Sequence, residues 1–253
     1  AFLRERGVRL LLLDLDNTLA PYSGPGPTAE LFAWKEALLQ EGFAVRSVNS
    51  MLAGVNAWLR TIGREDCRVK NLRLQRQVYT PPGKEMDLTD YEKLLRAAEG
   101  NPRLKLLMQT IASTGIRISE LRFFTVEAVR RGEVTVRAKN KSRVIMIPDK
   151  IRKRLLSYCA GQGIKAGVIF RTRGGNPLDR SNVWSDMKKL CAAAGVDQEK
   201  VFPHNLRKLF ARCFYKRKTD IAKLADVLGH SSIDTTRIYI MTSGAAHKHI
   251  VNR

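Results

Sequence analysis

The chain has 253 residues, 44% of them hydrophobic, which is enough to bury one large core or two smaller ones. Its 45 lysines and arginines outnumber its 24 aspartates and glutamates, and the resulting formal net charge of +21 points to a polyanionic partner, above all nucleic acid. No apolar run approaches the roughly 20 residues of a membrane-spanning helix, which argues against a membrane protein, and four cysteines without a CxxC pair favour reduced thiols in a cytoplasmic protein.

The first 87 residues change character twice. An unbroken apolar run ending in acidic residues, "VRLLLLDLDNTLAPY" at 8–22, predicts a buried strand, and "SGPGPT" after it predicts a turn. Apolar residues at helical spacing predict helices over 28–42 and 47–63, the second with Ser47 as its N-cap. Residues 64–87 are rich in Arg and Lys and contain Pro-Pro-Gly, so they predict a basic linker with a domain boundary.

The rest of the chain is expected to be mainly helical with one β-hairpin. Alternating apolar residues at 133–138 and 143–148 predict the two paired strands, and "GVIF" at 167–170 predicts a further short strand. Helical spacing covers residues 88–100, 102–115, 149–163, 180–195, 203–216, 220–229 and 232–241. The predicted fold class is therefore mainly α with a small antiparallel β-sheet, an α+β arrangement.

Four segments in this second part carry side chains suited to phosphoryl transfer without a metal. They are "STGIRISEL" with Arg117, "RAKNKSR" with Lys139 and Lys141, "HNLRK" with His204 and Arg207, and "LGHSSIDTTRIYI" with His230 and Tyr239. Guanidinium groups can bind the non-bridging oxygens of a phosphate, and positive charge makes a phenol a usable nucleophile. Taken singly, each residue is as well explained by a surface, capping or buried structural role.

Taken together, these segments resemble the tyrosine recombinases, the integrase family of phage and transposon integrases and Xer proteins. That family combines an Arg in a "TGLR-SEL" segment, a hairpin Lys, H-x-x-R, an "LGH" His and a downstream Tyr. The matching residues here are Arg117, Lys139, His204, Arg207, His230 and Tyr239. The hairpin segment is one residue shorter than the commoner family form, so Lys141 is an alternative to Lys139.

The resemblance implies a site-specific recombinase that cleaves and rejoins double-stranded DNA. Tyr239 would attack the scissile phosphate and form a 3′-phosphotyrosyl link, while two arginines would bind the phosphate. Lys139 would protonate the leaving 5′-oxygen, His204 would exchange a proton with Tyr239, and His230 would hydrogen-bond a phosphate oxygen. It also implies a homotetramer on DNA, with no metal or nucleotide cofactor, no membrane and no small-molecule substrate.

The excess of basic residues also suits this function. Several flank the predicted linker, where a clamp around a duplex needs positive charge, although a solvated basic face explains any one of them equally well. These residues are Arg60, Arg64, Arg68, Lys70, Arg73 and Arg76. The nearby Trp34 and Trp58 are expected to pack in a helical core rather than stack on bases.

The N-terminal part departs from the family. A recombinase of this family normally begins with a helical core-binding domain of about four helices, on the order of 80 residues at ordinary helix lengths. Residues 28–82 have room for about half of such a domain and the basic linker. Residues 1–27 instead resemble the D-x-D-x-T motif of haloacid-dehalogenase-like phosphatases, with Asp14, Asp16 and Thr18 in place. The interpretation is a vestigial or fused fragment at 1–27, followed by a catalytic domain at 83–253.

Three functions therefore stand as hypotheses. The leading one is a DNA recombinase, whose topoisomerase-like variant would relax supercoils without strand exchange. The second is a DNA-binding remnant of a recombinase that no longer cleaves. The third is a magnesium-dependent phosphatase that uses Asp14, which is disfavoured because its completing lysine and acidic motif are not identifiable. The composition suits a bacterial mobile element, and the sequence does not name the DNA target.

Overall fold

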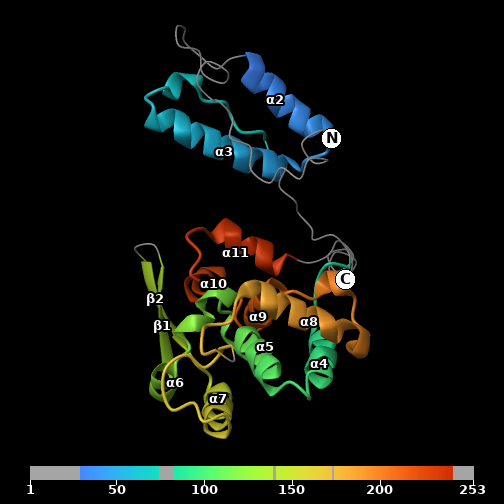
Figure 1. The fold of residues 1–253 in the computed structure, drawn as a ribbon, viewed down its shortest axis with the longest axis vertical. Helices are drawn as coiled ribbons and strands as arrows, with labels where there is room; N and C mark the ends of the chain where they lie inside the picture. Colours follow the sequence, from blue (N-terminus) through green and yellow to red (C-terminus); the bar gives the residue numbers. More distant parts are fainter. Residues whose placement is uncertain (1–28, 74–82, 139–140, 173, 242–253) are drawn as a thin grey trace. The chain divides into compact units, whose positions relative to one another are not determined.

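The computed structural model describes residues 29–73, 83–138, 141–172 and 174–241. Contacts divide the chain into two units, Ala1–Gln77 and Val78–Arg253, which are drawn in Figure 1. The predicted strand at 8–22, with Asp14, Asp16 and Thr18, lies outside the described residues, as does Lys139.

In the smaller unit, two helices pack on each other: α2 (Ala29–Gln40) and α3 (Val45–Thr61). A short 3-10 helix, η1 (Glu65–Cys67), follows them. The prediction that Ser47 caps the second helix was wrong, because α3 starts after Ala44 and the Ser47 amide already donates to the Ala44 carbonyl. The expectation for the two tryptophans is confirmed: the Trp34 and Trp58 rings pack against the small apolar clusters of this unit.

The segment after η1 belongs to this unit rather than to a linker. Asn56 on α3 pairs through its side-chain amide with both backbone groups of Val69, at 2.9 and 3.1 Å. Asn49, two turns earlier on α3, does the same for Leu72, at 2.9 and 2.8 Å. The Val69 side chain is buried in the same core. The two asparagines therefore fix an extended chain along α3, and the predicted linker was too long at its start.

The larger unit is mainly helical with a two-stranded antiparallel sheet, which confirms the predicted fold class. Its elements are α4 (Leu88–Ala97), α5 (Pro102–Thr114), η2 (Ile118–Phe123), α6 (Val126–Arg131), β1 (Glu133–Ala138), β2 (Lys141–Met146), α7 (Asp149–Gly161), α8 (Arg180–Ala194), η3 (Gln198–Lys200), α9 (Pro203–Arg217), α10 (Ile221–Leu228) and α11 (Ile233–Ile240). The strand predicted at 167–170 was wrong, since Val168 makes only an isolated bridge to Thr125.

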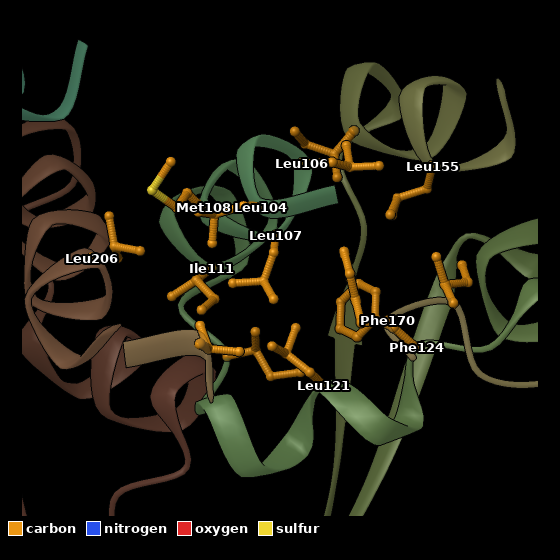
Figure 2. Close-up of a cluster of buried hydrophobic side chains, with 14 of the residues drawn as sticks. Leu104, Leu106, Leu107, Met108, Ile111, Leu121, Phe124, Leu155, Phe170 and Leu206 are labelled. Carbon is orange, nitrogen blue, oxygen red and sulfur yellow. The ribbon is translucent and has the colours of Figure 1, made fainter. Parts of the chain in front are cut away.

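Helix α5 runs through the centre of the larger unit. It starts at Asn101, whose side chain accepts from the Leu104 amide, with Pro102 in the first turn, and it ends at Gly115. Side chains on several of its faces are buried, and Figure 2 shows them packed against α7, α9 and the loops beside η2. The residues labelled there are Leu104, Leu106, Leu107, Met108, Ile111, Leu121, Phe124, Leu155, Phe170 and Leu206. Because α9 packs on this core, its polar residues have fixed positions.

Candidate active site

Two of the helices that end at a left-handed glycine, α5 and α10, bring their C-terminal ends to the site. Gly115 ends α5 and Gly229 ends α10, each with φ of 64°. A Cβ on Gly115 would collide with the ring of Phe210, so a close approach also requires glycine there. The last carbonyls of a helix lack partners within it and carry partial negative charge. The carbonyls of Gly115, Leu228 and Gly229 therefore offer acceptors to cationic side chains.

Arg207 on α9 uses two of these carbonyls. Only 1% of the residue is exposed. Its guanidinium donates to the Gly115 carbonyl, to the Leu228 carbonyl at 2.6 Å, and to Nε2 of His230 at 3.0 Å. Burial lowers the pKa of Arg207 to about 10. No carboxylate of the described residues forms a salt bridge with Arg207, so its charge stays available to an incoming anion.

Arg117 lies just before η2 and is held by the carboxylate of Glu120. Glu120 accepts from the Arg117 amide and from its Nη1, both at 2.9 Å, and Arg117 Nη2 donates to the Gly229 carbonyl at 3.2 Å. The Arg117 side chain is 41% exposed, so it can meet a ligand from solvent. Arg143 on β2 donates to the same Glu120 carboxylate at 2.6 Å.

These groups line a pocket of about 340 Å³ beside the end of α10. Its walls include the cations Arg117 and Arg143, the carboxylates of Glu120 and Asp226, and His230. With the adjacent buried Arg207, three guanidinium groups face two carboxylates, so the site has a net positive charge that an anion such as a phosphate would balance.

Tyr239 lies on α11 among these residues and is only 8% exposed. Its ring centroid is 5.0 Å from that of His204 and 4.7 Å from that of His230, both in edge-to-face orientation. The Arg207 guanidinium lies 5.7 Å from the centre of the Tyr239 ring. Tyr239 also raises the pKa of Arg207 against the effect of burial, since its oxygen can accept from the guanidinium and its phenolate form would attract it.

The hydrogen bonds of His230 define its tautomer. A guanidinium can only donate, so Nε2 of His230 accepts from Arg207, and Nδ1 carries the proton that it donates to the Thr236 hydroxyl at 2.9 Å. Desolvation and the nearby arginines lower the pKa of His230 to about 4. His204 is an exposed residue whose ring packs on Tyr239, and desolvation, with the charges of Lys208 and Arg207, lowers its pKa to about 4. Both imidazoles are therefore neutral at pH 7.

Five of the six residues singled out from the sequence come together here: Arg117, His204, Arg207, His230 and Tyr239. Lys139 lies outside the described residues, and the alternative Lys141 begins strand β2.

Sequence reasoning missed Arg143. The signal was present, because Arg143 has the same strand parity as the apolar Ile145 and Ile147, both of which are buried.

Other kinds of site receive no support from the described residues. No group of three or more His, Cys, Asp or Glu side chains within them is arranged to hold a metal ion. Three of the four cysteines, Cys67, Cys159 and Cys191, are buried. None of the described helices combines the length and apolar character needed to cross a bilayer.

Comparison with known proteins gives a consistent family. Residues 84–245 match the model of the phage integrase family. The tyrosine recombinase XerA of Pyrococcus furiosus is 28% identical over 239 residues, which cover 91% of this chain and 82% of XerA. The tyrosine recombinase XerD of Pseudomonas aeruginosa is 28% identical over 255 residues, which cover 94% of this chain and 81% of XerD.

Among solved structures, the Tn1549 transposon integrase in complex with transposon right end DNA has the same fold. Its TM-score is 0.68 at 15% identity, over 88% of this chain and 83% of the integrase chain. The fold and the site define a mainly helical protein with a cationic pocket and, packed on its His230, a tyrosine. The chain belongs to the phage integrase family, the tyrosine recombinases.

Proposed function

We propose that this protein is a site-specific DNA recombinase that cleaves and rejoins DNA through a 3′-phosphotyrosyl intermediate. The observation that carries the proposal is the gathering of four side chains from three separate stretches of the chain at one tyrosine. His204, Arg207 and His230 lie against the Tyr239 ring, and Arg117 joins them by donating to the carbonyl of Gly229, next to His230. Membership of the tyrosine recombinase family supports the same activity.

Arg117 and Arg207 are the proposed phosphate-binding residues. Both already bind helix-terminal carbonyls, so their guanidinium groups are oriented before DNA arrives. Preoriented donors stabilise the charge that develops on the non-bridging oxygens during attack, and they need little reorganisation to do so. No carboxylate among the described residues pairs with Arg207, which leaves its charge for the phosphate.

Tyr239 is the proposed nucleophile and His204 its base. The phenolic oxygen forms the new bond to phosphorus, and its proton passes to a neutral imidazole beside it. His204 suits this role because its ring packs edge-to-face on Tyr239 and its lowered pKa keeps it unprotonated at pH 7.

The bond from phosphorus to the 5′-oxygen breaks in the same step, and Lys139 is the proposed donor of the proton that the 5′-oxygen takes up. His230 is proposed to donate to a phosphate oxygen. Its Nε2 accepts from Arg207 in the free protein, so this role requires His230 to gain a proton when the negative phosphate arrives. The same groups acting in reverse would rejoin the strands.

Double-stranded DNA is the proposed partner, bound by a homotetramer that joins two duplexes in the cytoplasm. The net charge of +21 supports a polyanionic partner. In the smaller unit, Arg68, Lys70 and Arg73 are exposed along the segment that the α3 asparagines hold in place. We propose that these three side chains bind phosphates of the duplex.

The test is a covalent trap on a nicked suicide substrate, in which the strand 3′ of the cleaved phosphate is lost so that rejoining fails. Incubation with a library of labelled duplexes should yield a protein–DNA adduct with the label on Tyr239. Tyr239→Phe should bind DNA and form no adduct. Tyr158→Phe is the matched control, because Tyr158 lies on α7 outside the pocket, and it should form the adduct as the unmodified chain does.

The outcomes separate the candidate functions. A wild-type chain that binds duplexes without forming any adduct supports the DNA-binding remnant instead. An adduct that persists in Tyr239→Phe refutes the assignment of the nucleophile. Supercoil relaxation with no exchange between duplexes supports the topoisomerase-like variant.

A further inference from the structure

A half-buried arginine outside the predicted set, Arg143, lies against this pocket. Arg143 stands opposite Val136 in the β1–β2 register, and its strand neighbours alternate between the two faces. Ile145 is buried with Val136, whereas Val144 and Met146 are 54% and 72% exposed. Arg143 therefore points to the covered face, and its side chain is 14% exposed. A charged side chain seldom occupies such a position unless partners compensate it.

The partners of Arg143 belong to two other segments of the site. Its Nη2 donates to the Glu120 carboxylate at 2.6 Å, and its Nη1 donates to the Leu228 carbonyl, which also accepts from Arg207. Its Nε is buried, with no hydrogen-bond partner among the described residues. Arg143 thus connects strand β2 with η2 and with the C-terminal end of α10.

Glu120 links Arg143 to Arg117. Its two carboxylate oxygens accept from the Arg117 amide, from Arg117 Nη1 and from Arg143 Nη2. Without Arg143, the buried Glu120 carboxylate would keep only its bonds to Arg117. The Arg117–Glu120 pair would then lose its connection to β2 and to the Leu228 carbonyl, so the Arg117 guanidinium beside the Gly229 carbonyl would be held less firmly.

Arg143 lies very close to the backbone of Gly229. A Cβ at position 229 would lie 2.7 Å from the Arg143 Cδ and would also collide with its Nη1. The glycine is therefore needed for the left-handed φ of 64° and for the passage of this arginine. The loop that carries His230 and the strand that carries Arg143 are fitted to each other.

We propose that Arg143 is a positioning residue of the recombinase: through Glu120 and the Leu228 carbonyl it holds Arg117 and the His230 loop in the geometry that receives the scissile phosphate. The inference rests on the proposed function. It assigns Arg143 no contact with DNA, and its effect on cleavage passes through Arg117.

The experiment compares cleavage of an ordinary suicide substrate with one that carries a methylphosphonate at the scissile position. The methyl group replaces a non-bridging oxygen and removes the negative charge that Arg117 is proposed to neutralise. Arg143→Met should slow single-turnover cleavage of the ordinary substrate about 100-fold, the order expected when a reacting group is misplaced by about an ångström. On the methylphosphonate the loss should shrink to less than about 10-fold, as it should for Arg117→Met, because a neutral phosphate no longer needs a precisely held guanidinium.

Three further variants make the result decisive. Arg131→Met removes the same charge from an exposed position at the end of α6, and it should match wild type on both substrates. Arg143→Lys keeps the charge while losing one of the two connections. If Arg143→Met does not fold, Arg143→Lys should show the same rescue by methylphosphonate with a smaller initial loss. Combining Arg143→Met with Arg117→Met should add little to the single Arg117→Met defect, because both act through one interaction.

Failure of the proposed function and failure of the proposed role of Arg143 give different results. A wild-type chain that forms no adduct overturns the proposed function, and the role of Arg143 with it. A wild-type chain that cleaves while Arg143→Met matches Arg131→Met overturns the role of Arg143 alone. Equal slowing of both substrates by Arg143→Met and Arg143→Lys overturns it as well, since a general loss of folding affects both substrates alike.

Discussion

Glu120→Gln tests whether one carboxylate holds the cationic site together in the free protein. The Glu120 side chain is 8% exposed and pairs with both Arg117 and Arg143. Glutamine keeps the shape, yet it removes the charge and turns one acceptor into an NH₂ that can only donate towards a guanidinium. Removing one partner of a buried ion pair costs about 3–5 kcal/mol. Because the Arg117 side chain is 41% exposed, solvent screening favours the lower end, about 3 kcal/mol.

The assay is calorimetric unfolding of the full chain at low salt. For a domain of this size class, about 1 kcal/mol shifts Tm by about 2–4 °C, so Glu120→Gln should lower the main transition by about 6–12 °C. Glu92→Gln is the control, since it removes the same charge from an exposed position on α4 and should shift Tm by less than about 2 °C. Added inorganic phosphate should stabilise Glu120→Gln more than wild type. Equal Tm values for the two variants would refute the reasoning.

Three further results are expected. In NMR titrations of the free protein, the His204 and His230 rings should titrate near pH 4. Because these rings titrate at about 6.5 in the unfolded chain, the folded state binds fewer protons than the unfolded state between pH 4 and about 6.5. The free energy of unfolding should therefore fall as the pH drops from about 6.5 to 4. A pKa near 6.5 for either ring in the folded protein would contradict this. DNA affinity should fall about 10³ to 10⁵-fold between 50 and 200 mM salt if six to ten phosphates are bound, and Arg68→Gln should reduce the logarithmic slope by about 1, whereas an unchanged slope would show that Arg68 binds no phosphate. Gly229→Ala should lower the free energy of unfolding by about 1–2 kcal/mol for the left-handed backbone alone, and further because the new Cβ displaces Arg143. In an Arg143→Met background the steric part should be smaller, so the double variant should lose less than the sum of the two single losses. A loss equal to that sum would contradict the close approach of Arg143 to Gly229.

Much of the catalytic fold could be predicted because its signals are local. The helices from α4 to α11 with more than six residues have apolar periodicity, and several start at a capping side chain, such as Asn101 of α5 or Ser232 of α11. The strand alternation at 133–138 predicted β1 with the correct bounds. The six-residue helix α6 was missed because so short an element shows hardly two helical turns of pattern.

Long-range contacts were the main source of error. The segment at 68–73 has the composition of a linker, yet the side chains of Asn49 and Asn56 and the burial of Val69 make it part of the smaller unit. The isolated bridge of Val168 to Thr125 replaces a predicted strand because no second strand lies beside it among the described residues. In both cases the residues next to the segment in sequence do not indicate which distant residue it will pair with.

The sequence by itself determined the charge of the protein, its helical character and the chemical groups available at the site: guanidiniums, imidazoles and a phenol in a recognisable order. Only the tertiary structure decided that they meet, that Arg143 joins them, and that both imidazoles stay neutral. The physical reason is distance along the chain. Arg207 and the Gly115 carbonyl are 92 residues apart in sequence, and only core packing brings such groups to hydrogen-bonding distance, where burial and neighbouring charges then set their pKa values.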